Sequence, residues 1–110
     1  MRVFERLRTL RTFEKQHLSF LRTVEDHDLV CEIGYHQAEG RALTLKQIFL
    51  LDVGSVATVQ RRLRRLKQLG VVHQHRSAAD GRAIELTLSA RCLKLFEKYE
   101  ALFRRVERRA

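Results

Sequence analysis

Apolar side chains recur at steps of three to five positions along the first 24 residues. They are Phe4, Leu7, Leu10, Phe13, Leu18, Leu21 and Val24. Polar and charged residues fill the gaps, and this spacing is typical of an amphipathic α-helix. We therefore predict an N-terminal helix over residues 1–24.

A second helix is predicted to follow and to end near residue 38. Acidic residues at positions 25, 26 and 28 suit its N-terminus, where they face the positive end of the helix dipole. Gly40 suits its C-terminus, because glycine readily takes the left-handed conformation in which many helices end. The expected buried positions are Leu29, Val30, Cys31 and Ile33.

The next 30 residues contain the signals of two short helices joined by a tight turn. Thr44 and Gln47 have the spacing of a capping box, which predicts a helix to about residue 51. Residues 52–54 form the turn, and Ser55 is an N-cap for a helix that Gly70 ends. Two helices separated by a short glycine-containing turn are the pattern of a helix-turn-helix.

After Gly70 the apolar pattern alternates, in residues 71–75 and 83–88, around a polar tip with the turn-forming pair Asp80 and Gly81. Ser89 then caps a final helix to about residue 108, with an apolar stripe. Its members are Leu93, Phe96, Tyr99, Leu102, Phe103 and Val106. The expected fold is mainly α with a small β-hairpin wing, a winged helix-turn-helix. We predict one domain over residues 1–110, with segments 1–24, 25–90 and 89–108.

The charge of the chain is concentrated in its middle. The formal net charge is +9, and residues 41–82 hold nine basic and two acidic side chains. Residues 1–40 hold six basic and seven acidic ones. Charge gathered in one segment is typical of a nucleic-acid footprint, although an anionic membrane surface would also attract it.

Five of the seven residues from 61 to 67 are basic and none is acidic. Val59, Leu63 and Leu66 define the buried face of this helix, and Val56 and Leu69 are expected to extend it. Arg61 would then lie on the outer face beside other arginines, and like charges three or four residues apart repel. A solvated helix face is the alternative explanation, but phosphates would supply the missing counter-charge.

The predicted DNA contacts follow from position on this helix and on the wing. The first turn of such a helix meets base edges in the major groove, so Gln60 and Arg61 are the candidate base readers. Arg64 and Arg65 are expected to bind phosphates, while the stem of Arg62 covers apolar surface. The full predicted set is Ser55, Ala57, Thr58, Gln60, Arg61, Arg62, Arg64, Arg65, Arg76 and Arg82.

Residues 58–72, TVQRRLRRLKQLGVV, resemble the recognition helix of the MarR-type winged-helix transcriptional regulators. Residues 80–89, DGRAIELTLS, resemble the wing of the same family. The resemblance covers about residues 28–92 and implies dimeric, sequence-specific binding of double-stranded DNA. It also implies that Arg82 enters the minor groove with Asp80 orienting it, the alternative being an ordinary exposed ion pair.

The sequence departs from the family pattern in the first helix of the motif. Phe49 stands where a small alanine is usual, and Asp52 where a leucine is common. The chain is also shorter than most members, which leaves less helix for a dimer and for a ligand pocket. A small-molecule effector is therefore not carried over to this chain and stays unknown.

Other kinds of chemistry find little support. Cys31 and Cys92 lack metal-ligand spacing, so both are predicted to be reduced and buried, with redox sensing as the minor alternative. His73 and His75 lack further ligands for a metal. We expect no cofactor and no enzyme activity, because no nucleophile elbow, phosphate loop or carboxylate pair is present. No membrane span or export signal is evident, which favours a cytoplasmic location.

The first and last helices carry apolar stripes longer than a small domain needs. They could complete the core of one chain or form the interface of a homodimer, which we favour. The predicted function is a dimeric regulator of transcription. A protein-interaction or assembly module with the same fold, or a replication- or RNA-associated winged helix, remains the alternative.

Overall fold

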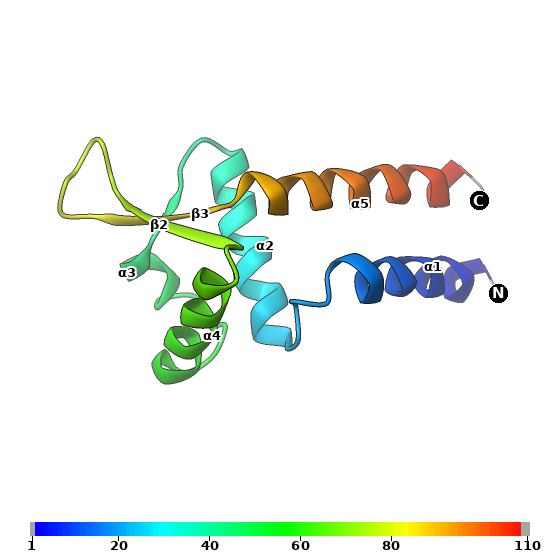
Figure 1. The fold of residues 1–110 in the computed structure, drawn as a ribbon, viewed down its shortest axis with the longest axis horizontal. Helices are drawn as coiled ribbons and strands as arrows, with labels where there is room; N and C mark the ends of the chain where they lie inside the picture. The colour runs from blue at the N-terminus through cyan, green and yellow to red at the C-terminus, as the bar shows by residue number, and fades with distance from the viewer. Residues whose placement is uncertain (1, 109–110) are drawn as a thin grey trace. The chain divides into compact units, whose positions relative to one another are not determined.

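The computed structural model describes residues 2–108 of the chain. They form five helices and three short strands, in the order α1 (Arg2–His17), α2 (Val24–Ala38), β1 (Leu43–Thr44), α3 (Leu45–Ile48), α4 (Val56–Gln68), β2 (Val72–Arg76), β3 (Ile84–Leu88) and α5 (Ala90–Arg108). Figure 1 shows this order in colour along the ribbon. The predicted winged helix-turn-helix fold, mainly α with a small wing, is confirmed.

The chain divides into two compact units. Residues 21–89 form one, and the described residues 2–20 together with 90–108 form the other. The first contains the helix-turn-helix and the wing, and the second contains α1 and α5. That the two fold as a single domain stays a prediction.

The prediction of one helix over residues 1–24 is wrong, because α1 ends at His17 and α2 begins at Val24. Thr23 and Asp26 explain the new start: the Thr23 hydroxyl accepts the Asp26 N–H at 3.1 Å, and Asp26 Oδ2 accepts the Thr23 N–H at 3.2 Å. This reciprocal capping box begins a helix without help from apolar spacing. Val24 kept the spacing regular, yet it is 72% exposed.

The predicted caps of the helix-turn-helix are confirmed. The Thr44 hydroxyl accepts the Gln47 N–H at 3.1 Å, and Gln47 Oε1 accepts the Thr44 N–H at 2.9 Å. Ser55 accepts the Thr58 N–H at 3.2 Å. Gly70 ends α4 with a φ of 72°. Helix α3 is shorter than predicted and stops at Ile48.

The core of the 21–89 unit joins all of its elements. Leu29 and Ile33 from α2, Ile48 from α3, Leu66 from α4 and Leu86 from β3 are fully buried. Helix α2 lies close to the sheet, since a Cβ built on Gly34 would come within 3.0 Å of Leu88 Cδ1. Cys31, by contrast, is exposed, so the prediction that it is buried is wrong, whereas Cys92 is buried as expected.

Within residues 2–108 the wing is part of a three-stranded antiparallel sheet in the order β1-β3-β2. The sequence predicted β2 and β3 but missed β1, whose two residues pair Leu43 with Leu86 and Thr44 with Glu85. Strand β2 pairs Val72 with Leu88 at its inner end. By pairing with β3, strand β1 holds the base of the wing against the helix-turn-helix.

The second unit pairs α1 with α5, as both ribbons in Figure 1 show. Tyr99 of α5 donates a hydrogen bond to Glu14 Oε2 at 2.6 Å, and its ring meets Phe13 edge to face at 5.1 Å. Tyr99 also stacks edge to face on Phe103 at 4.5 Å. An aromatic cluster therefore holds the pair together.

Candidate nucleic-acid interface

Helix α4 presents a continuous polar stripe. An α-helix turns about 100° per residue, so positions 57, 61, 64 and 68 fall on one side, away from buried Val59 and Leu63. All four of these side chains are exposed: Ala57, Arg61, Arg64 and Gln68. The predicted buried face is confirmed at its centre. We call these four residues the α4 stripe.

The predicted ends of the buried face are wrong. Val56 is 52% exposed and Leu69 is 43% exposed. They are the first residue of α4 and its C-cap, where the helix has turned out of the core. Val56 therefore adds an exposed apolar side chain next to the Ser55 cap.

The first turn of α4 is held in a fixed geometry. Besides accepting the Thr58 N–H, Ser55 donates its hydroxyl proton to Thr58 Oγ1 at 3.0 Å. Ser55, Ala57 and Gln60 are exposed, and Thr58 is half-buried. The N–H groups of a first helical turn have no partner in the preceding turn, so they can bind a phosphate oxygen.

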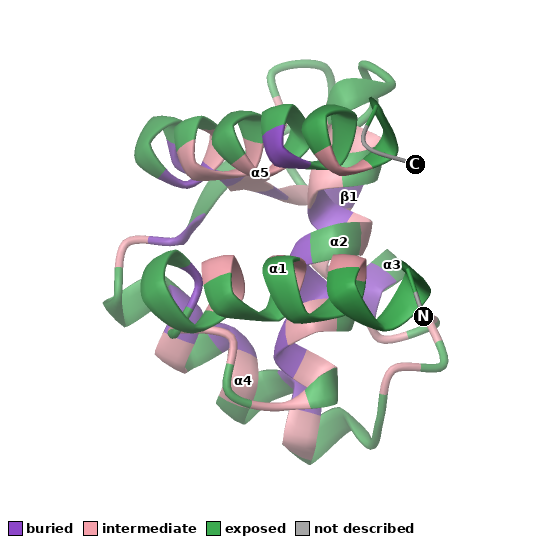
Figure 2. Cartoon of the chain, turned by 90° about the vertical axis from the view of Figure 1, so that its right-hand side faces the viewer, coloured by how far each residue is buried: buried purple, intermediate pink, exposed green. Residues whose placement is uncertain are grey.

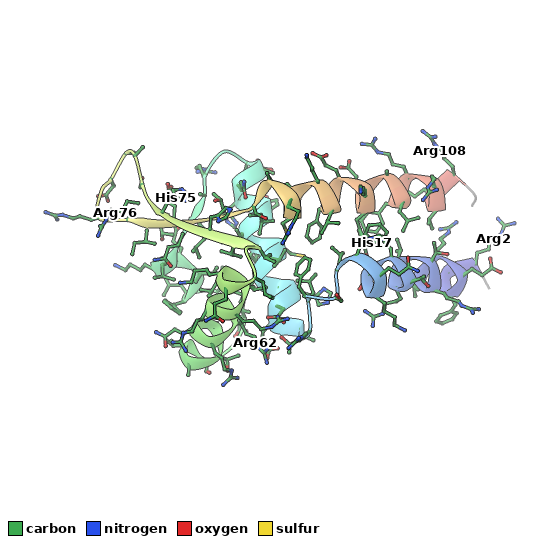
Figure 3. All side chains as sticks on the ribbon, viewed as in Figure 1. Arg2, His17, Arg62, His75, Arg76 and Arg108 are labelled. Carbon is green, nitrogen blue, oxygen red and sulfur yellow. The ribbon has the colours of Figure 1, made fainter. Side chains whose placement is uncertain are left out.

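The arginines of α4 differ in their surroundings. Arg61 and Arg64 are exposed, while Arg62, marked in Figure 3, is half-buried. Arg62 Nε is buried and has no hydrogen-bond partner among the described residues. Arg65 has the partner that the sequence did not reveal, since Arg65 Nη1 lies 3.2 Å from Asp26 Oδ2. An acid from α2 thus relieves part of the repulsion on α4.

The wing tip is braced by its own polar groups. Arg76 Nη1 donates to the Gly81 carbonyl at 3.0 Å, and Figure 3 shows Arg76 on the outer part of the wing. Asp80 Oδ1 accepts the Arg82 N–H at 3.0 Å, so Asp80 shapes the loop through the backbone of Arg82. Ser77 closes the loop by donating its N–H to Ala83 at 2.9 Å.

This loop is longer than a two-residue turn. Strand β2 ends at Arg76 and strand β3 begins at Ile84. Gly81, between them, does not adopt a positive φ. The Asp80-Gly81 pair therefore lies inside the tip without forming the turn type for which such pairs are known. Arg76 and Arg82 are both exposed on it.

Strand β2 connects the helix to the wing tip as a polar edge. Only its first residue, Val72, is buried, and the next four positions are exposed. Lys67 of α4 donates to Gln74 Oε1 at 2.9 Å, and His75 lies 3.6 Å from a Glu85 carboxylate oxygen. Sequence reasoning left Lys67, Gln68 and Gln74 out of the site. The regular spacing of Gln68 from Arg61 and Arg64 was the available signal.

The part of the chain that the structure describes contains neither a metal-ligand cluster nor a membrane-spanning helix. No three His, Cys, Asp or Glu side chains among residues 2–108 gather where they could hold a metal ion. None of the helices described there is long and apolar enough to pass through a membrane.

The directions in which the two thiol pKa values are shifted do not favour redox sensing. Although Cys31 is exposed, partial burial of its thiol raises its pKa, and the neighbouring carboxylates of Asp28 and Glu32 raise it further. Burial raises the pKa of Cys92 to about 11. Redox-sensing cysteines need a lowered pKa, because the thiolate is the reactive form.

The fold resembles that of several solved structures. One is S. aureus MepR in complex with DNA, at a TM-score of 0.74 and 23% identity, over 96% of this chain and 75% of that one. Another is MarR, at 0.59 and 19% identity, over 96% and 74%. A third is S. aureus MepR bound to ethidium bromide, at 0.64 and 21% identity, over 89% and 71%. No family model and no curated protein matches the chain in sequence.

Proposed function

We propose that the chain binds double-stranded DNA as a homodimer and regulates transcription, acting as a binding protein without enzyme activity. The α4 stripe carries this proposal. It places two exposed arginines, a small residue and an amide on one side of a helix that begins with a fixed, open first turn. The likeness of the fold to MepR, which has been solved with DNA, supports the same assignment.

In the proposed complex α4 enters the major groove. Ala57 lets the backbone approach the bases, and the Ser55 end of the helix binds a backbone phosphate. Gln60 and Arg61 lie near the start of the helix, where base edges are read, with Gln suited to adenine and Arg to guanine. Arg64 lies one turn further along and binds a phosphate that sets the register.

The wing contributes the second contact in this proposal. Arg82 reaches the minor groove from a loop that Asp80 shapes, and a narrow minor groove attracts an arginine. Arg76 braces the loop and adds positive charge beside the phosphates. A cytoplasmic location is part of this proposal.

The homodimer is proposed from the surface of α1 and α5. None of the α1 residues, Arg2–His17, is buried, and Figure 2 shows this helix in the colours of exposed and intermediate positions. Phe4 is 64% exposed, Leu7 is 47% exposed and Phe103 of α5 is 41% exposed. A second copy covering these side chains would form a two-fold assembly with two α4 helices for two half-sites.

Fluorescence anisotropy with a random-sequence duplex across a salt series tests DNA binding. We expect affinity that falls steeply with salt, because phosphate contacts release counterions from the DNA. An absence of binding at low salt, or binding without a salt slope, would favour the assembly module instead. Competition by single-stranded RNA at equal affinity would favour the RNA-associated alternative.

Residue roles separate in a selected binding site. Arg61→Ala is expected to cost about 1–3 kcal/mol at that site and to reduce its preference over random DNA. Arg64→Ala is expected to weaken binding to all sequences to a similar degree. Equal losses on all sequences from both variants would contradict this division of roles.

A further inference from the structure

Asp26 is a completely buried carboxylate that joins two helices. One of its oxygens, Oδ2, accepts the backbone N–H groups of Arg22 at 2.9 Å and of Thr23 at 3.2 Å. The same oxygen accepts Arg65 Nη1 at 3.2 Å, from a residue 39 positions later in the chain. A single side chain thus caps α2 and binds α4.

Arg65 lies on the flank of α4 that faces α2. Its side chain is only 20% exposed, whereas Arg61 and Arg64 on the α4 stripe are exposed. Thr58 lies on the same flank about two turns earlier. It is beside the Gly54 turn, where a Cβ on Gly54 would meet both Glu25 and Thr58 at 3.6 Å. The N-terminal part of α2 therefore follows this side of α4.

Asp26 holds one guanidinium nitrogen of a side chain that is mostly covered, so a phosphate could take over the whole guanidinium of Arg65 only by drawing it away from Asp26. The second carboxylate oxygen, Oδ1, is buried and has no hydrogen-bond partner among the described residues. Removal of the guanidinium would leave a negative charge in the core with only two backbone N–H bonds. Breaking one half of a buried ion pair is strongly unfavourable, so the pair resists exchange for a solvent-exposed phosphate.

We propose that Arg65 is a positioning residue, which fixes the rotation of α4 against α2 through Asp26 and does not bind phosphate. The proposal rests on DNA binding by α4, because rotation matters only if the α4 stripe must face the groove. Arg61 projects from one side of α4, so a rotation of α4 about its own axis would turn Arg61 away from the base edge that it reads. Asp26 thereby influences base reading without touching DNA.

The salt dependence of binding separates the two roles of Arg65. Each phosphate contact contributes about −0.9 to the slope of log K against log salt on duplex DNA. Arg64→Gln is the matched control, and it should reduce the steepness of the slope by about 1. Arg65→Gln should leave the slope unchanged and should lower the preference for a selected site over random DNA roughly five-fold or more. A slope that changes equally in both variants would overturn the proposal.

A double-mutant cycle tests the Asp26–Arg65 interaction in the free protein. Arg65→Gln should lower the thermal midpoint of unfolding, while Arg64→Gln should not, because only Arg65 leaves a buried carboxylate unpaired. Asp26→Asn keeps a capping oxygen and removes the charge, so Arg65→Gln should cost much less in that background. Additive effects of the two substitutions on stability would show that Asp26 and Arg65 do not stabilise each other, and this would reject the proposal. Unfolding of Arg65→Gln at the assay temperature, with Arg64→Gln still folded, supports it.

The DNA-binding measurement and the double-mutant cycle test different parts of the argument. If the wild-type chain does not bind duplex DNA, the proposed function fails, and the cycle still reports whether Asp26 and Arg65 stabilise each other. If DNA is bound and the cycle shows no coupling, only the positioning role is rejected.

Discussion

The two compact units of this chain bury their apolar residues to very different degrees. In residues 21–89 every helix and strand contributes at least one buried side chain, and five leucine and isoleucine side chains are fully buried: Leu29, Ile33, Ile48, Leu66 and Leu86. In the α1–α5 pair, within residues 2–108, α1 buries none of its residues and α5 buries Cys92 and Leu102. Equal apolar periodicity in sequence therefore leads to unequal burial in structure.

The difference teaches what periodicity reports. Regular spacing shows that a helix has an apolar face, but it does not identify what covers that face. For α2 and α4 the cover is the rest of the same unit. For α1, the described residues leave much of the apolar face uncovered, and this is the reason for proposing a second copy.

The largest expected effect comes from placing a charge on the exposed apolar face of α1. Leu7→Asp should convert a dimer into a monomer, because the carboxylate would be buried unpaired in the interface. Light scattering after size exclusion should then return about half the wild-type mass. Affinity for a two-half-site DNA should fall roughly 10²–10⁴-fold as avidity is lost.

Gln16→Asp is the matched control on α1. It adds the same charge at an exposed polar position and should leave the mass and the DNA affinity unchanged. A wild-type chain that already runs at 13.0 kDa would remove the dimer from the proposal.

Core truncation should affect the two units unequally. Leu66→Ala in the 21–89 unit is expected to reduce the free energy of unfolding by about 2–5 kcal/mol, because Leu66 is fully buried. Leu7→Ala, measured in the monomeric state at low concentration, should cost under about 1 kcal/mol. Urea denaturation followed by circular dichroism gives both values, and comparable losses would contradict the comparison.

Loss of a helix cap should have a smaller effect. Thr23→Ala removes the hydroxyl that begins α2 and should destabilise the protein by about 1 kcal/mol. Thr9→Ala is the control, since its hydroxyl bonds only the Glu5 carbonyl within α1. A thermal melt that shifts equally for both would argue against the capping box as the start of α2.

The smallest effect concerns thiol chemistry. Because its pKa is raised, Cys31 should carry less thiolate at pH 8 than a free thiol, and its alkylation should be slower. The rate should rise as the pH passes above the usual thiol pKa. Cys92, with a pKa of about 11 and little exposure, should react only after unfolding. Fast labelling of Cys31 at pH 7 would restore redox sensing as an alternative.

Local signals in the sequence predicted much of the fold. The caps at Thr44 and Ser55 and the ends at Gly40 and Gly70 all depend on residues within a few positions of each other. The exposed side of α4 followed from the buried positions 59, 63 and 66. These features are determined by backbone hydrogen bonding and helix geometry alone.

Contacts between distant positions were out of reach. The Asp26–Arg65 pair joins two residues 39 positions apart, and the sequence assigned Asp26 only a general role at a helix N-terminus. Strand β1 exists because Leu43 meets Leu86, and two residues have no period of their own. Val56 and Leu69 continue the apolar spacing of α4 into places where nothing covers them.

The close approach of α2 to the sheet has a consequence for how this sequence can evolve. Glycine weakens a helix interior by about 1 kcal/mol relative to alanine, yet at position 34 a methyl group would meet Leu88 Cδ1 at 3.0 Å. A side chain there requires Leu88 Cδ1 to move by a few tenths of an ångström, or a smaller residue at position 88. Positions 34 and 88 should therefore vary together in natural homologues and in selected libraries, as a linked pair across the core.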